Sequence, residues 1–111
     1  MEKFSGYGQY QLELEMAQAA RASGNEGKAR VCARRAAGII VGEYFKQRGI
    51  GLSDPSAYAR LKYLISLPDI PAEIRQVVEH FLVRVDTDQN LPISADLIAE
   101  AGWLESKLLN H

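Results

Sequence analysis

The sequence has a single cysteine, Cys32, so an internal disulfide is excluded. It also lacks a long hydrophobic run, because stretches such as residues 39–41 fall far short of the roughly 20 apolar residues that span a bilayer. The opening residues, 1–10, contain neither the basic region nor the apolar stretch of a secretory signal. These absences predict a cytoplasmic protein with no membrane role.

Charge of one sign is missing as well, because 13 basic and 14 acidic residues nearly cancel. A global field directed at nucleic acid or at an anionic membrane is therefore excluded. Hydrophobic residues make up 47% of the 111 residues and charged residues 24%, which is the composition of an ordinary packed domain and excludes a disordered or repetitive chain. A chain of this length forms one hydrophobic core, so we expect a single domain over residues 1–111.

Between its four prolines and nine glycines, the sequence carries the three-to-four-residue hydrophobic spacing that is typical of helices. We expect helices over residues 7–22 and 26–48, from Asp54-Pro55 to Ser66, from Pro71 to Val85, and after a cap at Ser94. A tight turn at Gly24-Asn25 joins the first two helices as an antiparallel pair. The predicted fold is all-α: an antiparallel up-and-down four-helix bundle with one short extra helix.

Hydrophobic stripes predict which face of each long helix is buried. The helix over residues 26–48 has a stripe of mostly small residues that lets a neighbour approach closely: Ala29, Ala33, Ala36, Ala37, Ile40 and Tyr44. The stripe expected on the first helix is Leu12, Met16, Ala19 and Ala20. On the last two helices the buried residues are expected to be Ile74, Val77, Val78, Phe81, Leu82 and Val85, and then Leu97, Ala101, Leu104 and Leu108.

The nearly neutral total charge conceals a separation of charge along the chain. Residues 25–48 contain six basic and two acidic side chains, whereas residues 71–111 contain three basic and seven acidic ones. A basic helix with apolar groups between its charges can bind phosphate groups or an acidic partner. The candidate ligand-binding residues are Lys28, Arg30, Arg34 and Arg35. The alternative is a solvated face that is paired with the acidic helices.

Gly38 and Gly42 lie four residues apart in the middle of the longest helix, where each glycine costs about 1 kcal/mol relative to alanine. Close approach of another helix compensates such a cost, and we predict an interface there between two copies of the chain. The alternative is that the glycines accommodate a bulky neighbour within the core. Trp103 lies opposite the apolar stripe of the last helix, so it is either a further interface residue or packs under the short helix or the N-terminus.

Arg75 and His80 form an Arg-x4-His spacing, and histidine is the side chain best suited to proton transfer near neutral pH. On one continuous helix the two lie about 140° apart around the axis, so both reach one substrate only in a cleft between two copies. The alternative is a surface ion pair between Arg75 and Glu79. Neither a metal nor a cofactor is expected, because the sequence has no metal-ligand cluster and no glycine-rich phosphate loop.

Two parts of the chain resemble a known family. The run of small and basic residues from Ala19 to Gly38, in a helix that ends at Gly49, resembles the first two helices of HEPN domains (higher eukaryotes and prokaryotes nucleotide-binding). The helix opened by Pro71, the polar turn after it and Leu91-Pro92 before the last helix are similar to the second half of those domains. The resemblance spans most of the chain and implies a four- to five-helix bundle, usually dimeric and often paired with a small nucleotidyltransferase.

Some HEPN domains are RNases with an Arg-x4-6-His motif in a dimer cleft, and the resemblance places that motif at Arg75 and His80. Two features depart from it: Gln76 stands where the motif usually has Asn, and residues 81–85 continue as amphipathic helix. We therefore expect a non-catalytic, dimeric HEPN-like module that binds a nucleotide, RNA or a protein partner. The alternatives are a toxin-like RNase that uses Arg75 and His80, and a purely structural protein-interaction bundle.

Overall fold

The computed structural model describes residues 7–52, 54–83 and 96–109, and all regular secondary structure within them is helical. The helices are α1 (Tyr7–Ala22), α2 (Glu26–Gln47), α3 (Ala57–Ile65), α4 (Ala72–Leu82) and α5 (Leu97–Leu109). The predicted all-α class is therefore confirmed over the described ranges. None of these helices is long and apolar enough to cross a membrane.

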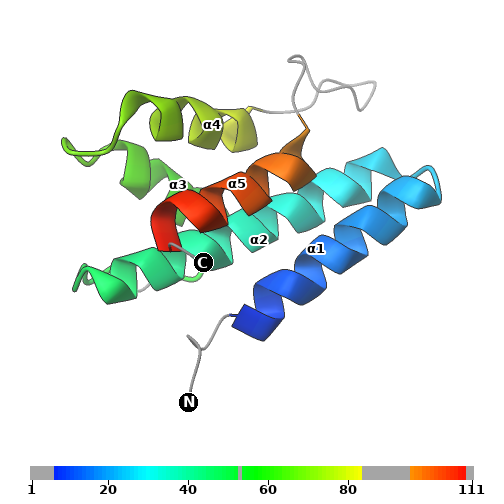
Figure 1. The fold of residues 1–111 in the computed structure, drawn as a ribbon, viewed down its shortest axis with the longest axis horizontal. Coiled ribbons are helices and arrows are strands. Elements are labelled where there is room, and N and C mark those ends of the chain that lie inside the picture. The colour runs from blue at the N-terminus through cyan, green and yellow to red at the C-terminus, as the bar shows by residue number, and fades with distance from the viewer. Residues whose placement is uncertain (1–6, 53, 84–95, 110–111) are drawn as a thin grey trace.

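Helix α2 runs through the middle of the molecule, with α1 and α5 packed along it, while α3 lies beside its C-terminal half (Figure 1). Helix α4 packs on α3 and α5. Helices α1 and α2 form the predicted antiparallel pair, because the chain reverses at Gly24, whose positive φ of 86° suits glycine. Asn25 then caps α2, since its side-chain oxygen accepts a hydrogen bond from the backbone N–H of Lys28 at 3.1 Å.

The predicted core stripe of α2 is confirmed, because all six of its residues are buried. Burial also extends to residues outside the stripe: Cys32, Gly38, Val41 and Phe45. A single stripe is enough for a helix with one neighbour, whereas α2 is packed against α1, α3 and α5. The predicted stripe of α5 is buried too, and on α4 Ile74, Val78 and Phe81 are buried.

The buried face predicted for α1 is confirmed only in part, since Ala20 is buried and Met16 packs against the core. Leu12 is 56% exposed and Ala19 is exposed, whereas the residues that enter the core are Tyr10, Ala17 and Ala20. Hydrophobic residues lie all around α1, so spacing alone does not select one face. The structure places Ala17 and Ala20 in the core, where a leucine would hold the two helix axes further apart.

Two predicted helix starts are shifted. Helix α3 begins at Ala57 and not at Pro55, because Ser56 is its N-cap: the Ser56 hydroxyl accepts a hydrogen bond from the backbone N–H of Ala59 at 3.2 Å. Asp54 instead accepts a hydrogen bond from the N–H of Ser56 at 2.9 Å, which holds the turn before the helix. At α5, which begins at Leu97, the carboxylate of Asp96 accepts from the N–H of Ala99 at 3.3 Å; the cap predicted at Ser94 lies outside the described residues. The predicted end of α4 at Val85 is wrong, because the helix ends at Leu82 and Val83 is extended.

Helix α3 packs on the C-terminal half of α2 through a very close contact. A Cβ atom added at Gly38 would lie 2.5 Å from the Cβ of Ala57, and one added at Gly42 would lie 2.6 Å from the guanidinium of Arg60. Further along both helices the rings of Phe45 and Tyr63 meet edge to face, with centroids 5.5 Å apart. Residue numbers rise together along the two helices in these three contacts, so α3 runs parallel to α2. The up-and-down antiparallel order therefore does not describe this pair.

The turn between α1 and α2 is tied to the start of α5 by Arg21. Its guanidinium lies 2.8 Å from the carboxylate of Glu26 and 2.9 Å from that of Asp96. Hydrogen bonding to Arg21 is the main reason that the pKa values of Glu26 and Asp96 lie below their usual range. The ion pair with Asp96 connects residues that are 75 positions apart in the chain.

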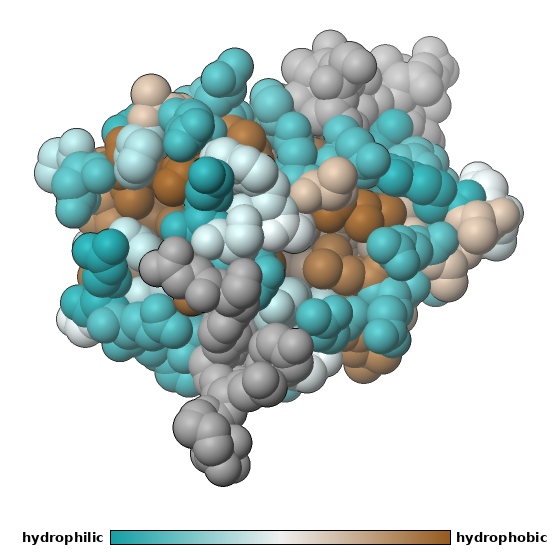
Figure 2. All heavy atoms as spheres, viewed as in Figure 1, coloured by the Kyte–Doolittle hydropathy of each residue, from teal (hydrophilic) through white to brown (hydrophobic). Residues whose placement is uncertain are grey.

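The face shown in Figure 2 is mostly hydrophilic, and the hydrophobic residues on it form separate patches between hydrophilic ones. Over the described part of the chain, the exposed large hydrophobic side chains are Leu12, Val31, Tyr58 and Tyr63. Each of them stands outside the continuous core that joins the five helices.

We expect Gly38→Ala to lower the free energy of unfolding. The new methyl group would lie 2.7 Å from the Cα of Ala57, and a backbone atom cannot swing away as a side-chain end can. Overpacking of this kind costs about 1–3 kcal/mol, against a gain of about 1 kcal/mol in helix propensity. Gly102→Ala in α5 is the control, because nothing lies within 4 Å of its added Cβ. Urea unfolding that found the two variants equally stable would contradict the contact.

We also expect acid to weaken the ion pairs of Arg21. Because the folded-state pKa values of Glu26 and Asp96 are lowered, their stabilisation is present above about pH 5 and is lost as the pH falls through those values. The side chains are partly exposed, so the effect is small. The stability difference between wild type and Arg21→Gln, measured by urea unfolding, should shrink from pH 7 to about pH 3. A difference that stays constant over this range would refute the prediction.

Candidate functional site

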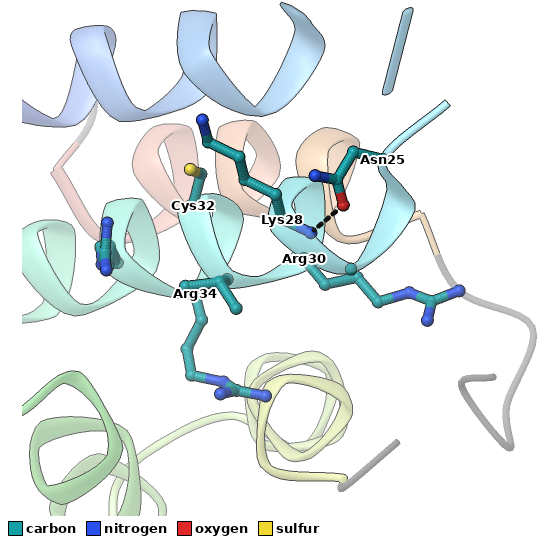
Figure 3. Close-up of a pocket in the computed structure, with 8 residues that line it drawn as sticks. Asn25, Lys28, Arg30, Cys32 and Arg34 are labelled. Carbon is teal, nitrogen blue, oxygen red and sulfur yellow. Dashed lines mark hydrogen bonds between the residues drawn. The ribbon is translucent and has the colours of Figure 1, made fainter. Parts of the chain in front are cut away.

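A pocket of about 470 Å³ lies along the N-terminal half of α2 (Figure 3). All four residues predicted to bind a ligand line it: Lys28, Arg30, Arg34 and Arg35. Asn25, the N-cap of α2, lies at one end. None of the described residues that line the pocket carries a carboxylate. The structure therefore brings the predicted basic residues together around one pocket, and all of its charged lining residues are basic.

The basic side chains spread around the helix and do not converge on one point. Figure 3 shows Lys28 extending toward α1, while Arg34 extends the opposite way, toward α4. The Nε of Arg34 donates a hydrogen bond to the carbonyl of Phe81, 2.9 Å away at the end of α4. Arg34 therefore also connects two helices, and the arrangement suits an extended anion better than a single small one.

Arg35 is more exposed than Arg34, the other pocket arginine whose contact is described above. Its side chain is 57% exposed, and its nearest carboxylate oxygen, on Glu13 of α1, lies 3.9 Å away. Contacts this long between exposed groups contribute little to stability. Arg35 also lines a second hollow, of about 370 Å³, together with Arg60 of α3. It therefore borders both hollows and is available to a ligand in either.

The electrostatic potential of the pocket is favourable to anions for two further reasons. The N-terminus of α2 contributes the positive end of the helix dipole. The acidic residue of its first turn, Glu26, is bound to Arg21 and is not among the residues that line the pocket. The negative charge closest to the pocket in sequence is thus already paired with a cation.

Cys32 lines the pocket but is only 1% exposed. A thiol this inaccessible does not serve as a nucleophile. Over the described ranges, no group of three or more His, Cys, Asp and Glu side chains is placed to hold a metal ion. The chemistry that the pocket itself offers is the binding of anions.

Arg75 and His80 are directed at different parts of the fold. The guanidinium of Arg75 donates hydrogen bonds to carbonyl oxygens at the end of α3 and in the connection to α4, those of Ile65, Leu67 and Ile70. The Nδ1 of His80 instead lies 2.9 Å from a carboxylate oxygen of Glu100 on α5. Within one chain, the structure does not bring these two side chains to a common site.

The predicted interface residues have partners inside the chain. Gly38 and Gly42 allow the close approach of α3, so the alternative of a neighbour within the core accounts for both glycines. This contact gives no support to an interface between two copies of the chain at Gly38 and Gly42, which stays a prediction. Trp103 is half-buried and packs against the core, and the Nζ of Lys107 lies 5.6 Å from its ring centroid. An interface role for Trp103 stays a prediction.

One basic residue was missed by the sequence reasoning. Arg60 of α3 lies over α2, where it donates hydrogen bonds to the carbonyls of Gly38 at 3.2 Å and Asp54 at 2.9 Å. The segment around it, Tyr58–Tyr63, places two basic residues between two tyrosines, and this pattern is the signal that could have identified it.

No protein-family model, no curated protein and no solved structure matches the chain. The resemblance to HEPN domains therefore stays a prediction from the residues.

We expect Arg75→Ala to destabilise the fold. The substitution removes a charged donor from three backbone carbonyls, and such hydrogen bonds contribute about 1.5–3 kcal/mol. His80→Ala is the comparison and should cost less, because the single side-chain contact of His80 with Glu100 is partly exposed. Thermal unfolding measures both. A near-zero effect of Arg75→Ala would show that these hydrogen bonds do not support the fold.

Proposed function

We propose that the pocket on α2 binds the phosphate groups of a nucleotide or of RNA, and that the protein is a non-catalytic HEPN-like binding module. One observation carries the proposal: four basic residues line a single pocket without a carboxylate among its described lining residues. Cations held in a hollow attract phosphate oxygens, and the counterions released from the nucleic acid add to the affinity.

The division of roles among the basic residues supports binding at the accessible ones. Lys28 is exposed and Arg35 is 57% exposed, so both can meet a phosphate without breaking a helix contact. Arg34 holds the end of α4 and thereby fixes one wall of the pocket. We propose that Lys28 and Arg35 provide most of the binding, and that Arg34 positions the surface.

A non-catalytic function agrees with the chemistry of the remaining groups. The guanidinium of Arg75 is engaged with backbone carbonyls, and His80 is paired with Glu100. The alternative of an RNase requires these side chains to leave those partners and to meet in a cleft between two copies. The homodimer, a nucleotidyltransferase-type partner and the cytoplasmic location are parts of the proposal that depend on the sequence alone.

The pocket is tested by removing its two accessible charges together. We expect Lys28→Ala with Arg35→Ala to weaken binding of a fluorescein-labelled ten-nucleotide RNA and of labelled ATP, measured by fluorescence anisotropy. The slope of log affinity against log salt for the RNA should fall by about 1–2, because two phosphate contacts are lost. The matched control is Arg48→Ala with Lys107→Ala, which removes the same charges elsewhere: Arg48 lies over the Tyr44 ring and Lys107 over Trp103.

Three other outcomes would overturn the proposal. Equal binding by the pocket variant and its control would remove the pocket from consideration. Cleavage of the labelled RNA that His80→Ala abolishes would establish the RNase alternative. Retention of a protein partner, with neither RNA nor ATP bound, would favour a purely structural interaction bundle.

A further inference from the structure

The outer face of α3 carries a second hollow of about 470 Å³, remote from the basic residues of α2 in sequence. Tyr58 and Tyr63 line it and are 48% and 40% exposed. The remaining lining residues are Leu52, Ala59, Lys62 and Ser66, so no carboxylate is present among the described ones. We refer to the hollow formed by these six residues as the tyrosine shelf.

The shelf is held rigidly by the core beneath it. Tyr63 packs edge to face on Phe45 of α2, which is 1% exposed. The Nζ of Lys62 lies over the ring of Tyr58, 5.8 Å from its centroid, so a positive charge borders one face of this ring. Two exposed rings fixed next to a cation form a surface on which flat aromatic groups can stack.

Basic residues connect the shelf to the pocket on α2. Arg35 lines that pocket and also the hollow of about 370 Å³ between α2 and α3. Arg60 lines the same middle hollow, and Tyr63 follows it three residues later, which makes the two neighbours on the surface of α3. Cations thus lead from Lys28 through Arg35 and Arg60 to the tyrosines, past Glu13, which also lines the middle hollow.

The charge of this surface decides between two kinds of occupant. A hydrophobic peptide would cover the rings, but it would offer no negative partner to Arg60 and Lys62, nor to Arg35, whose one carboxylate contact, with Glu13, is 3.9 Å long. A single-stranded nucleic acid complements both features, since its bases stack on aromatic rings and its phosphates pair with the cations. The basic groups also spread apart along α2, which fits successive phosphates of a strand better than the clustered phosphates of one nucleotide.

We propose that the tyrosine shelf stacks bases of a single-stranded RNA whose phosphates lie in the α2 pocket. This proposal rests on the proposed function and narrows it from any phosphate-bearing ligand to a strand that has bases. Tyr58 and Tyr63 provide the stacking surfaces, while Arg35 and Arg60 guide the backbone between the two hollows. The bases are recognised by their faces, so we expect little preference for sequence.

The experiment compares two labelled oligomers that have equal charge, a ten-nucleotide oligoadenylate and an abasic strand of the same length. In fluorescence anisotropy, Tyr58→Ala should weaken oligoadenylate binding roughly 5- to 150-fold, the range for loss of one stacked base. It should leave the affinity for the abasic strand unchanged. Tyr58→Phe keeps the ring and should keep the affinity. Leu12→Ala is the control for loss of an exposed hydrophobic side chain, since Leu12 is 56% exposed on α1.

The outcomes distinguish base stacking on the tyrosine shelf from phosphate binding in the α2 pocket. Equal effects of Tyr58→Ala on both oligomers, or no effect on either, would overturn base stacking while the abasic strand still reports on the pocket. Failure of the wild type to bind either oligomer would overturn base stacking on the shelf, and failure to bind labelled ATP as well would overturn the proposed function. Binding of an acidic aromatic peptide that depends on Tyr58, without binding of oligoadenylate, would assign the shelf to a protein partner instead. Because Tyr58 is exposed, Tyr58→Ala should fold, and circular dichroism checks this directly.

Discussion

Close packing against the small residues of α2 is the constraint on which the other helices depend. Alanines along one side of α2 are fully buried against its neighbours, and Gly38 lets α3 approach until their backbones nearly touch. Small side chains bury little surface themselves, so the stabilisation comes from the larger residues that reach past them, such as Phe45, Phe81 and Leu104. A helix surrounded in this way can present charge only where no neighbour covers it.

The position of α3 therefore also determines where the candidate site lies. Helix α3 covers the face of α2 from Gly38 onward, and the earlier part of that face stays open. Val31 is accordingly exposed on α2, among the basic residues of the pocket. The ion pairs of Arg21 fix the turn before α2, so the open half is held in place at its beginning as well as at its end.

Much of the fold could be predicted from the sequence, because its signals are local. Helix positions follow from turn residues and hydrophobic spacing. The buried stripe of α2 follows from alanines whose spacing places them on one face of the helix. The buried face of α1 could be predicted only in part, since hydrophobic and polar residues are mixed around this helix and its spacing does not distinguish Ala17, which is buried, from Leu12, which is exposed. The direction of α3 along α2 was equally hidden, because spacing within a helix carries no information about its neighbour.

The candidate site was predictable as a charge cluster, but the use that the fold makes of each charge was not. Three arginines, Arg34, Arg60 and Arg75, donate hydrogen bonds to backbone carbonyls of other segments, contacts for which the sequence has no local pattern. An arginine bound in this way adds to the net charge of its segment and also holds the fold together. The number of basic groups that can donate hydrogen bonds to a ligand is therefore smaller than the number of basic residues. These groups are the exposed ones, such as Lys28 and Arg35. The Arg-x4-His spacing is subject to the same reasoning, because a guanidinium that joins two helices is held in place by the fold whether or not a substrate is present.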